Sequence, residues 1–327
     1  MQTVLVTGGF GLVGSAIQSV CGADLKYKFT FMSSSQCDLT DYDATLKYFK
    51  RVMPDAVIHL AAAVGGLFKN MRCKVEMFEN NMRINMNVLR ASHAVGVSKV
   101  VSCLSTCIFP DEKTKHGPID ETMLHMGAPH SSNDAYAYAK RMLEVQSRCY
   151  REQHGRNYVC VIPTNIYGPN DNFNLDDAHV IPALIHKCYL AKQQGLPLVV
   201  AGSGTPLRQF IYSRDLALLL IWTLEHYDAT HEDAEKVDGA GTLIISVDPE
   251  DEISIAEVVQ HIAHAFDFDN DILYDASQPD GQFKKTADNT KFKNLYGYKP
   301  PMTMTPIKWG IKETVQWFVQ HYYNARK

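Results

Sequence analysis

The sequence predicts an α/β protein with a doubly wound parallel sheet and a smaller C-terminal α/β domain. An apolar strand runs into a glycine turn and a helix at the start of the chain, and strand and helix patterns then alternate to about residue 165. Beyond that point the predicted elements are shorter, and loops rich in Asn, Asp, Gly and Pro separate them. The first part is therefore predicted to be Rossmann-like.

The first strand, Val4–Val6, leads into a turn with glycines at positions 8, 11 and 14, and Leu12–Val20 is predicted to be a helix. Such a unit brings unpaired backbone N–H groups to a helix N-terminus, where a pyrophosphate can bind. Gly8 allows a tight turn, Gly11 allows backbone to approach phosphate, and Gly14 allows the helix to pack close to the strand. The alternative is an ordinary turn in a parallel sheet, but the flanking strand and helix favour a dinucleotide site.

Four further strands and three helices are predicted in the first half of the chain. Asp38–Asp41 offers caps for the first of these helices, and glycines at 96 and 155 end the two long ones. The strands are Lys28–Met32, Ala56–Leu60, Lys99–Leu104 and Tyr158–Ile162, and the helices are Tyr42–Val52, Glu76–Val95 and Asp134–His154.

The second half is predicted to contain shorter elements around a loop at Asn165–Asp177. The last helix places Ile307, Ile311, Val315 and Phe318 on one face. An acidic stretch, Asp228–Gly241, is predicted to be an exposed insertion. The predicted helices are Val180–Gln194, Asp215–Tyr227, Ile253–Phe266 and Pro306–Tyr323, and the predicted strands are Leu198–Val200 and one near Gln209–Tyr212.

We expect two domains from this pattern. Residues 1–165 form the nucleotide-binding domain, and segments near 209–247 return to it. Residues 166–208 and 248–327 form the substrate domain.

Composition excludes several classes of protein. A formal net charge of −4 and the lack of a basic run argue against nucleic acid and anionic membranes as partners. The longest apolar run, Leu216–Trp222, is far short of the ~20 residues that span a bilayer, and no signal peptide is recognisable. The eight cysteines show neither a CxxC pair nor zinc spacing, so we expect reduced thiols, no metal site and a cytoplasmic protein.

The strongest catalytic signal is Tyr136 followed four residues later by Lys140, which places both on one helix face. A free tyrosine has a pKa of about 10, and a nearby ammonium lowers it. We therefore expect Lys140 to lower the pKa of Tyr136. Tyr138 is only two residues from Lys140 and should point elsewhere. Ser105, at the end of the fourth strand, can hydrogen-bond the oxygen on which the tyrosine acts.

The glycine turn, Ser105, Tyr136 and Lys140 together resemble the extended short-chain dehydrogenase/reductases, a family that transforms sugar nucleotides. The resemblance implies a nicotinamide cofactor. The end of the second strand, Met32–Ser35, carries hydroxyls and no carboxylate, which favours NADP(H) over NAD(H). Asp38 could reach an adenine edge or simply cap a turn. The implied cofactor contacts are Gly8, Gly9, Phe10, Gly11, Leu12, Val13, Gly14, Ser33, Asp38, Leu39, Lys140, Pro163, Thr164, Asn165, Ile166 and His179.

Finer motifs narrow the resemblance to bifunctional epimerase–reductases that convert GDP-4-keto-6-deoxy-D-mannose to GDP-L-fucose. These motifs are Ser105–Pro110, Pro163–Phe173, His179–Lys187, Gly202–Pro206 with Arg208–Ile211, and Asp280–Thr286. The resemblance implies that Cys107 and His179 are the base and acid of the epimerisations. It implies substrate contacts at Lys187, Arg208 and Asp280. On their own, residues of these types are more often a buried thiol, a loop histidine and surface charges.

Some positions depart from the pattern of these enzymes. Ala201 stands where they often have a tryptophan, and Phe10 stands where bacterial members often have an arginine. Rival functions are another nucleotide-sugar epimerase or dehydratase, or a non-catalytic NADP-binding module. A dehydratase should have an acidic pair where Thr106 and Cys107 stand. The resemblance also implies a homodimer through the two long helices.

Overall fold

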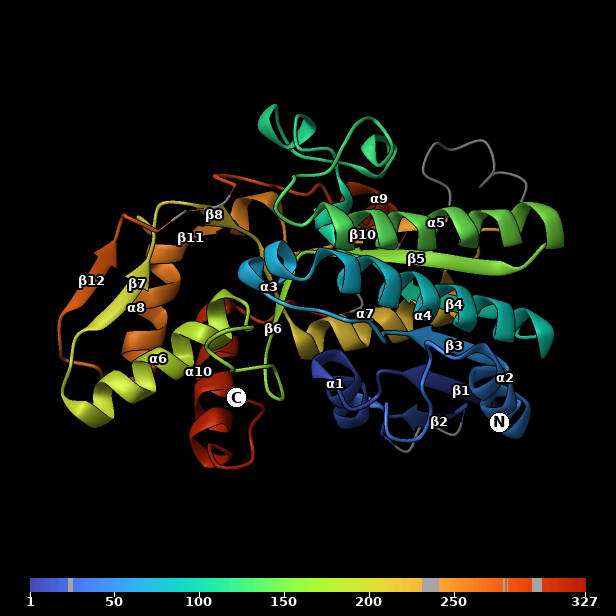
Figure 1. The fold of residues 1–327 in the computed structure, drawn as a ribbon, viewed down its shortest axis with the longest axis horizontal. Helices are drawn as coiled ribbons and strands as arrows, with labels where there is room; N and C mark the ends of the chain where they lie inside the picture. The colour runs from blue at the N-terminus through green and yellow to red at the C-terminus, as the bar shows by residue number, and fades with distance from the viewer. Residues whose placement is uncertain (23–25, 231–240, 279, 281, 296–301) are drawn as a thin grey trace.

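The computed structural model describes residues 1–22, 26–230, 241–278, 280, 282–295 and 302–327. Figure 1 shows a broad sheet covered by helices on both faces, beside a smaller lobe that contains much of the second half of the chain.

Six strands of the described chain form one parallel sheet in the order β10-β5-β4-β3-β1-β2. The strand order reverses between β1 and β3, and doubly wound folds bind their ligands at such a point. The five strands predicted for the first half are confirmed, whereas β10 was not predicted. The strands are β1 (Gln2–Thr7), β2 (Tyr27–Met32), β3 (Ala56–His59), β4 (Lys99–Cys103), β5 (Asn157–Pro163) and β10 (Thr242–Ile245).

Alternate residues along these strands face two separate apolar layers, as a doubly covered parallel sheet requires. Leu5, Val57 and Val100 face one layer, and their neighbours face the other. The first layer is covered by α2 (Tyr42–Val52), α4 (Lys74–Ala94) and α5 (Asp134–His154). The second is covered by α1 (Leu12–Val20) and α7 (Ser213–His226), with α9 (Thr290–Leu295) beside α7.

The smaller lobe has its own core. Ile311, Val315 and Phe318 are buried there as predicted, while Ile307 is partly buried against the same cluster, and Phe318 stacks on Phe173 at 4.4 Å between ring centroids. Its helices are α6 (Val180–Gln194), α8 (Ile255–Phe266) and α10 (Ile307–Gln320). Its strands are β7 (Leu198–Ala201) parallel to β12 (Ile272–Asp275), and β8 (Leu207–Arg208) antiparallel to β11 (Ile253–Ser254).

Several predicted boundaries were wrong for identifiable reasons. The predicted loop after Pro163 contains β6 (Asn165–Tyr167), because that segment pairs with β9 (Phe210–Tyr212), a distant strand. Helix α8 begins at Ile255 because Ser254 forms a capping box with Glu257.

Helix α4 begins at Lys74, two residues earlier than predicted, and α3 (Leu67–Arg72) precedes it. Helix α10 ends at Gln320 instead of Tyr323. Of the predicted acidic insertion, residues 231–240 lie outside the described residues. Within the described part of the chain, no helix has the length and apolar character to cross a bilayer.

Candidate active site

The glycine turn lies at the carboxyl end of β1 and is shaped by contacts that only glycine permits. Gly8 has a φ of +67°, and a Cβ on it would lie 2.8 Å from the Ala61 nitrogen at the end of β3. A Cβ on Gly14 would lie 2.5 Å from the Gly8 and Gly9 oxygens, so α1 packs directly on the turn. Both contacts agree with the roles expected from the sequence.

The same turn has the free donors and the space that a pyrophosphate needs. Gly11 is the N-cap of α1 and no side chain caps it, which leaves the first backbone N–H groups of the helix for another acceptor. A Cβ on Gly11 would meet only the Gly8 oxygen, at 3.3 Å, among the described atoms. The phosphate side of the turn is therefore accessible. Phe10, beside it, is 56% exposed.

The predicted adenosine-side residues lie at the end of β2. The Ser33 hydroxyl is within hydrogen-bond distance of Ser35 (2.9 Å), and the Ser33 N–H donates to Gln36. Asp38 accepts hydrogen bonds from the amide (2.9 Å) and hydroxyl (2.7 Å) of Thr40, and it therefore stabilises the turn before α2. Leu39 is buried.

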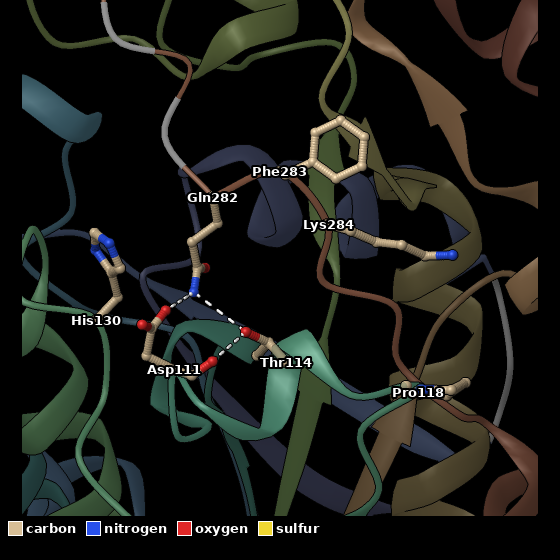
Figure 2. A pocket seen from close by; sticks show the side chains of 8 residues that line it. Asp111, Thr114, Pro118, His130, Gln282, Phe283 and Lys284 are labelled. Atoms are coloured by element: carbon tan, nitrogen blue, oxygen red, sulfur yellow. Dashed lines mark hydrogen bonds between the residues drawn. The ribbon is translucent and has the colours of Figure 1, made fainter.

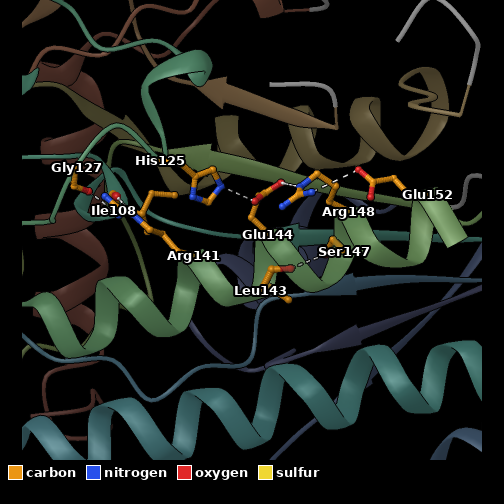
Figure 3. Close-up of polar contacts among 9 residues, drawn as sticks. All are labelled: Ile108, His125, Gly127, Arg141, Leu143, Glu144, Ser147, Arg148 and Glu152. Atoms are coloured by element: carbon orange, nitrogen blue, oxygen red, sulfur yellow. Dashed lines mark hydrogen bonds and ion pairs between the residues drawn. The ribbon is translucent and has the colours of Figure 1, made fainter. Parts of the chain in front are cut away.

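A short 3₁₀ turn after β4, Thr106–Ile108, carries Cys107. The Cys107 N–H donates to the Ser105 side chain, whose oxygen is 3.3 Å away, so the hydroxyl and the thiol come from one turn. Arg141 of α5 fixes this turn: its Nε donates to the Ile108 carbonyl, and its Nη1 donates to Gly127 (2.7 Å). Figure 3 shows these contacts from α5. Burial raises the pKa of the Cys107 thiol, and Lys285, the Ser105 hydrogen bond and Lys140 oppose it.

Tyr136 and Lys140 lie on one face of α5, and the lysine nitrogen is 5.9 Å from the centre of the phenol ring. Lys140 is buried, and its ammonium donates to the Cys103 carbonyl at 2.8 Å. The prediction that Lys140 lowers the tyrosine pKa is wrong for this structure. Burial raises the pKa of Tyr136 well above its ordinary value, and negative charge on Cys107 and Cys103 adds to the rise.

His179 is the N-cap residue of α6, a helix of the smaller lobe. The loop before it contacts the start of α3, because the Gly66 N–H donates to the Asp177 carbonyl at 2.8 Å and Lys69 pairs with the Asp177 carboxylate at 2.9 Å. The His179 ring is exposed, yet crowding by protein atoms lowers its pKa. No contact joins His179 to Cys107 among the described residues.

The segment from Pro163 to Ile166 leads from the end of β5 into β6. The Thr164 hydroxyl is buried and lacks a hydrogen-bond partner among the described residues. Such a group usually has a partner in the working protein. The backbone N–H and the side-chain amide of Asn165 both donate to the Gln209 carbonyl, at 3.2 and 2.9 Å. Thr164 therefore remains available to a ligand at the carboxyl end of the sheet.

The three predicted substrate contacts lie in the smaller lobe. Lys187 is half-buried on α6, two turns after His179. The Arg208 guanidinium donates to the carbonyls of Leu207 (2.6 Å) and Phe283 (3.2 Å), so part of its donor set binds backbone. Asp280 accepts hydrogen bonds from the amide (2.7 Å) and hydroxyl (2.8 Å) of Ser203 and thereby anchors its own segment to the turn after β7.

A cavity of about 730 Å³ opens between the 111–118 segment and residues Gln282–Lys284. Figure 2 shows Gln282 pointing toward Asp111 and Thr114, where its amide donates to Asp111 at 2.6 Å. None of the predicted site residues lines this cavity.

Sequence reasoning missed two residues that act on Cys107. Arg141 directly follows Lys140, and Lys285 lies within the Asp280–Thr286 motif, from which only Asp280 was selected. Position within that motif was the available signal for Lys285, but a Lys–Lys pair at 284–285 reads as surface charge.

Residues 4–236 match the model of the NAD dependent epimerase/dehydratase family. The chain is 52% identical to a GDP-L-fucose synthase of Dictyostelium discoideum over 100% of its own length and 98% of that protein, and 45% identical to a probable GDP-L-fucose synthase of Drosophila melanogaster over 100% of both. It also resembles a crystal structure of a GDP-L-fucose synthetase from Naegleria fowleri bound to NADP, with a TM-score of 0.89, 46% identity and coverage of 100% and 95%.

Proposed function

The chain belongs to the NAD dependent epimerase/dehydratase family, and we infer that it has GDP-L-fucose synthase activity. It epimerises GDP-4-keto-6-deoxy-D-mannose at carbons 3 and 5 and reduces the 4-keto group with NADPH. The observation that carries this inference is the set of groups around the end of β4. Ser105 and Cys107 come from one turn, and Tyr136 and Lys140 come from the helix beside it.

The cofactor is NADP(H), as in the Naegleria relative. The turn from Gly8 to Gly14 would hold the pyrophosphate, because its glycines leave room for it and the N-terminus of α1 supplies donors. Ser33, Asp38 and Leu39 would contact the adenosine end. Pro163–Ile166, Lys140 and His179 would contact the nicotinamide end. When bound, NADPH supplies the hydride that reduces carbon 4.

The epimerisations depend on the acidity that the carbon 4 ketone gives to the hydrogens on carbons 3 and 5. Removing either proton places negative charge on the ketone oxygen, and the Ser105 and Tyr136 hydroxyls would stabilise that oxygen. Cys107, as thiolate, takes the proton from one face. His179 returns a proton from the opposite face. These roles are supported by residue chemistry and by the relatives' printed activity.

Tyr136 donates the proton that converts the carbon 4 alkoxide to an alcohol. A raised pKa suits this direction, because the phenol stays protonated near neutrality and can donate. Lys140 donates to the Cys103 carbonyl, and its nitrogen lies 5.9 Å from the centre of the phenol ring.

Each of the two lobes binds a different ligand. Residues 1–165, with segments near 209–247, bind the cofactor. Residues 166–208 and 248–327 bind the GDP-sugar, through Lys187, Arg208 and Asp280. The opposite charges of the two cations and the diphosphate support this arrangement.

We also propose a homodimer formed through α4 and α5. Large apolar side chains are exposed along both helices, which is unusual for a surface that faces only water. Val75, Phe78 and Met86 on α4 are 65%, 40% and 40% exposed, and Tyr138 and Met142 on α5 are 39% and 37% exposed. Phe78→Glu should shift the protein to monomers in light scattering, while Phe283→Glu, on another surface, should not.

A reducing compartment such as the cytoplasm suits the cysteines. All eight are free thiols in the structure.

One assay tests the proposed activity. The protein is mixed with GDP-4-keto-6-deoxy-D-mannose and NADPH, and the sugar nucleotide formed is identified by NMR. GDP-L-fucose is the expected product. NADPH oxidation that leaves carbons 3 and 5 uninverted would leave only a reductase, and NADPH binding without turnover would indicate a non-catalytic module.

A further inference from the structure

Asp177 links the two lobes through both its backbone and its side chain. It lies two residues before His179, in the loop that leads into α6 of the smaller lobe. Its carbonyl accepts the Gly66 N–H at 2.8 Å, and its carboxylate pairs with Lys69 at 2.9 Å and with Arg72 at 3.9 Å. Gly66 is the N-cap of α3, and the two cations belong to that helix. In Figure 1, α3 lies on the side of the sheet that is next to the smaller lobe.

The peptide directly before His179 packs tightly against Gly66. A Cβ on Gly66 would lie 2.6 Å from the Ala178 carbonyl oxygen and 3.2 Å from that of Asp177. With φ −65° and ψ −178°, the backbone of Gly66 is open to any residue, so a glycine is needed here for space and not for conformation. Since the Ala178 carbonyl belongs to the same peptide as the His179 nitrogen, this contact sets where the His179 backbone begins.

The α3 side of the contact is itself fixed by hydrogen bonds. Asn70 is buried, and its side-chain amide donates to the carbonyls of Gly65 (2.7 Å) and Gly66 (3.1 Å). Shortly after β3 ends, the Ala63 backbone exchanges hydrogen bonds with the Asn81 side chain of α4, at 3.0 and 2.9 Å. The start of α3 therefore has a defined position relative to the sheet.

The loop before His179 is also attached to the smaller lobe. The Phe173 ring is buried in that lobe, and the Phe173 carbonyl is 2.7 Å from a ring nitrogen of His186 on α6. Within the loop, the Ala178 N–H donates to the Asn174 carbonyl at 2.8 Å. The loop is therefore attached to one lobe where it begins and to the other where it ends, and His179 follows directly.

The His179 side chain depends on its backbone for its position. The residue is the N-cap of α6, yet its exposed ring makes no capping hydrogen bond to that helix. Its carbonyl accepts the Ala183 N–H at 3.0 Å, which fixes the backbone to the first turn of α6. An acid must come within hydrogen-bond reach of the atom that it protonates, and a displacement of about 1 Å can cost about 100-fold in rate. Movement of the loop would therefore move the imidazole away from its target.

We propose that Asp177 is a positioning residue for the return of the proton by His179, because its contacts with Gly66 and Lys69 fix the preceding backbone relative to the sheet. The proposal rests on the role of His179 in the proposed function. Asp177 and Lys69 are partly exposed, and such ion pairs contribute little to stability. The main effect of the pair is therefore expected in the geometry of the site.

The test separates inversion of the sugar carbons from exchange of their hydrogens. Cys107 alone can remove a proton and return a deuteron to the same face, whereas inversion also needs His179 on the opposite face. In deuterated water, with NADP⁺ in place of NADPH so that reduction does not occur, mass spectrometry follows exchange and NMR follows inversion. Asp177→Ala should keep the exchange and lower the ratio of inversion to exchange by at least about tenfold.

Matched variants examine the cause of the effect. Asp176→Ala removes an exposed carboxylate next to Asp177 and should keep the wild-type ratio. Asp177→Glu keeps the charge and should stay closer to wild type than to Asp177→Ala. Replacing Lys69 and Arg72 together with methionine removes both cations and should lower the ratio. Gly66→Ala should also lower it, because the added methyl group would meet the adjoining carbonyl.

A wild-type ratio in Asp177→Ala would overturn the proposal, and so would an equal fall in Asp176→Ala. An equal loss of exchange and inversion in Asp177→Ala would also overturn it, because the damage to the site would then be general. If circular dichroism shows that Asp177→Ala does not fold, the double methionine variant takes its place, and a wild-type ratio in that variant would contradict the proposal.

A measurement without substrate separates this proposal from the proposed function. The imidazole signal of His179 in ¹³C-labelled protein is assigned by its absence in His179→Gln, and it should shift in Asp177→Ala but not in Asp176→Ala. A shifted signal without any inversion by the wild-type protein would refute the proposed activity and keep the contact that positions His179. Inversion by wild type, with signal and ratio both unchanged in Asp177→Ala, would keep the activity and refute the role of Asp177.

Discussion

Replacing Asp171 with asparagine should remove much of the dependence of stability on pH. Asp171 is 5% exposed, and one of its carboxylate oxygens lacks a hydrogen-bond partner among the described residues. Burial raises its pKa from 3.8 to about 7, while the Asn172 N–H and the charge of Arg326 act in the opposite direction. The folded protein therefore holds a proton that the unfolded chain releases.

The sign and size of the effect follow from this difference. Since the folded state has the higher pKa, stability is greatest below pH 3.8 and falls until the pH passes about 7. Between pH 5 and pH 8 the loss amounts to about 2–3 kcal/mol. Asp171→Asn cannot ionise, so relative to wild type it should gain about that much stability over the same interval.

Urea unfolding followed by circular dichroism at pH 5 and pH 8 measures the difference. Asp176→Asn, an exposed carboxylate in the same loop, is the control and should behave as wild type does. If Asp171→Asn loses as much stability as wild type between these two pH values, the reasoning about the buried carboxyl is wrong.

Four further outcomes are expected. Cys107→Ser should lose exchange of the sugar ring hydrogens in deuterated water by about 100-fold or more while still binding NADPH; undiminished exchange would exclude Cys107 as the base. Tyr136→Phe should keep that exchange and lose NADPH oxidation by a similar factor, and a wild-type reduction rate would remove its role. Gly8→Ala forces a positive φ and a 2.8 Å contact with Ala61, so it should cost at least about 1–2 kcal/mol in urea unfolding and weaken NADPH binding measured by fluorescence titration; equal values would contradict the turn geometry. Arg141→Met releases the turn that carries Cys107 and should slow ring-hydrogen exchange more than it weakens NADPH binding, whereas Arg148→Met, farther along α5, should affect neither.

Local patterns predicted the first half of the fold well. The helices Leu12–Val20 and Asp134–His154 match the structure to the residue, and a glycine marks one end of each, Gly11 before the first and Gly155 after the second. The sixth strand, β10, was missed because it pairs with β5 from a distant segment. Strand β6 was missed for the same reason, since its partner is β9. Pairing over such distances leaves no mark in the local pattern.

The candidate site also contains features that the local sequence predicted and features that depend on the fold. Residue type and spacing singled out the glycine turn, Ser105, Tyr136 and Lys140, and resemblance added Cys107. The direction of the tyrosine pKa was wrong, because it depends on how much water the surrounding lobes remove. Lys285, whose charge opposes the rise in the pKa of the Cys107 thiol, was missed because a lysine charge by itself is ordinary in a sequence.

The sequence by itself determined the βα alternation, the glycine turn with its accessible helix N-terminus, and the one-turn spacing of Tyr136 and Lys140. These features depend on neighbours within a few residues, whose sterics and hydrogen bonds act whatever the rest of the chain does. Only the tertiary structure decided which strands meet, which charges act on the pKa of Cys107 and which groups lose their water. Desolvation and charge pairing depend on atoms brought together from distant segments, so no local stretch of the chain encodes them.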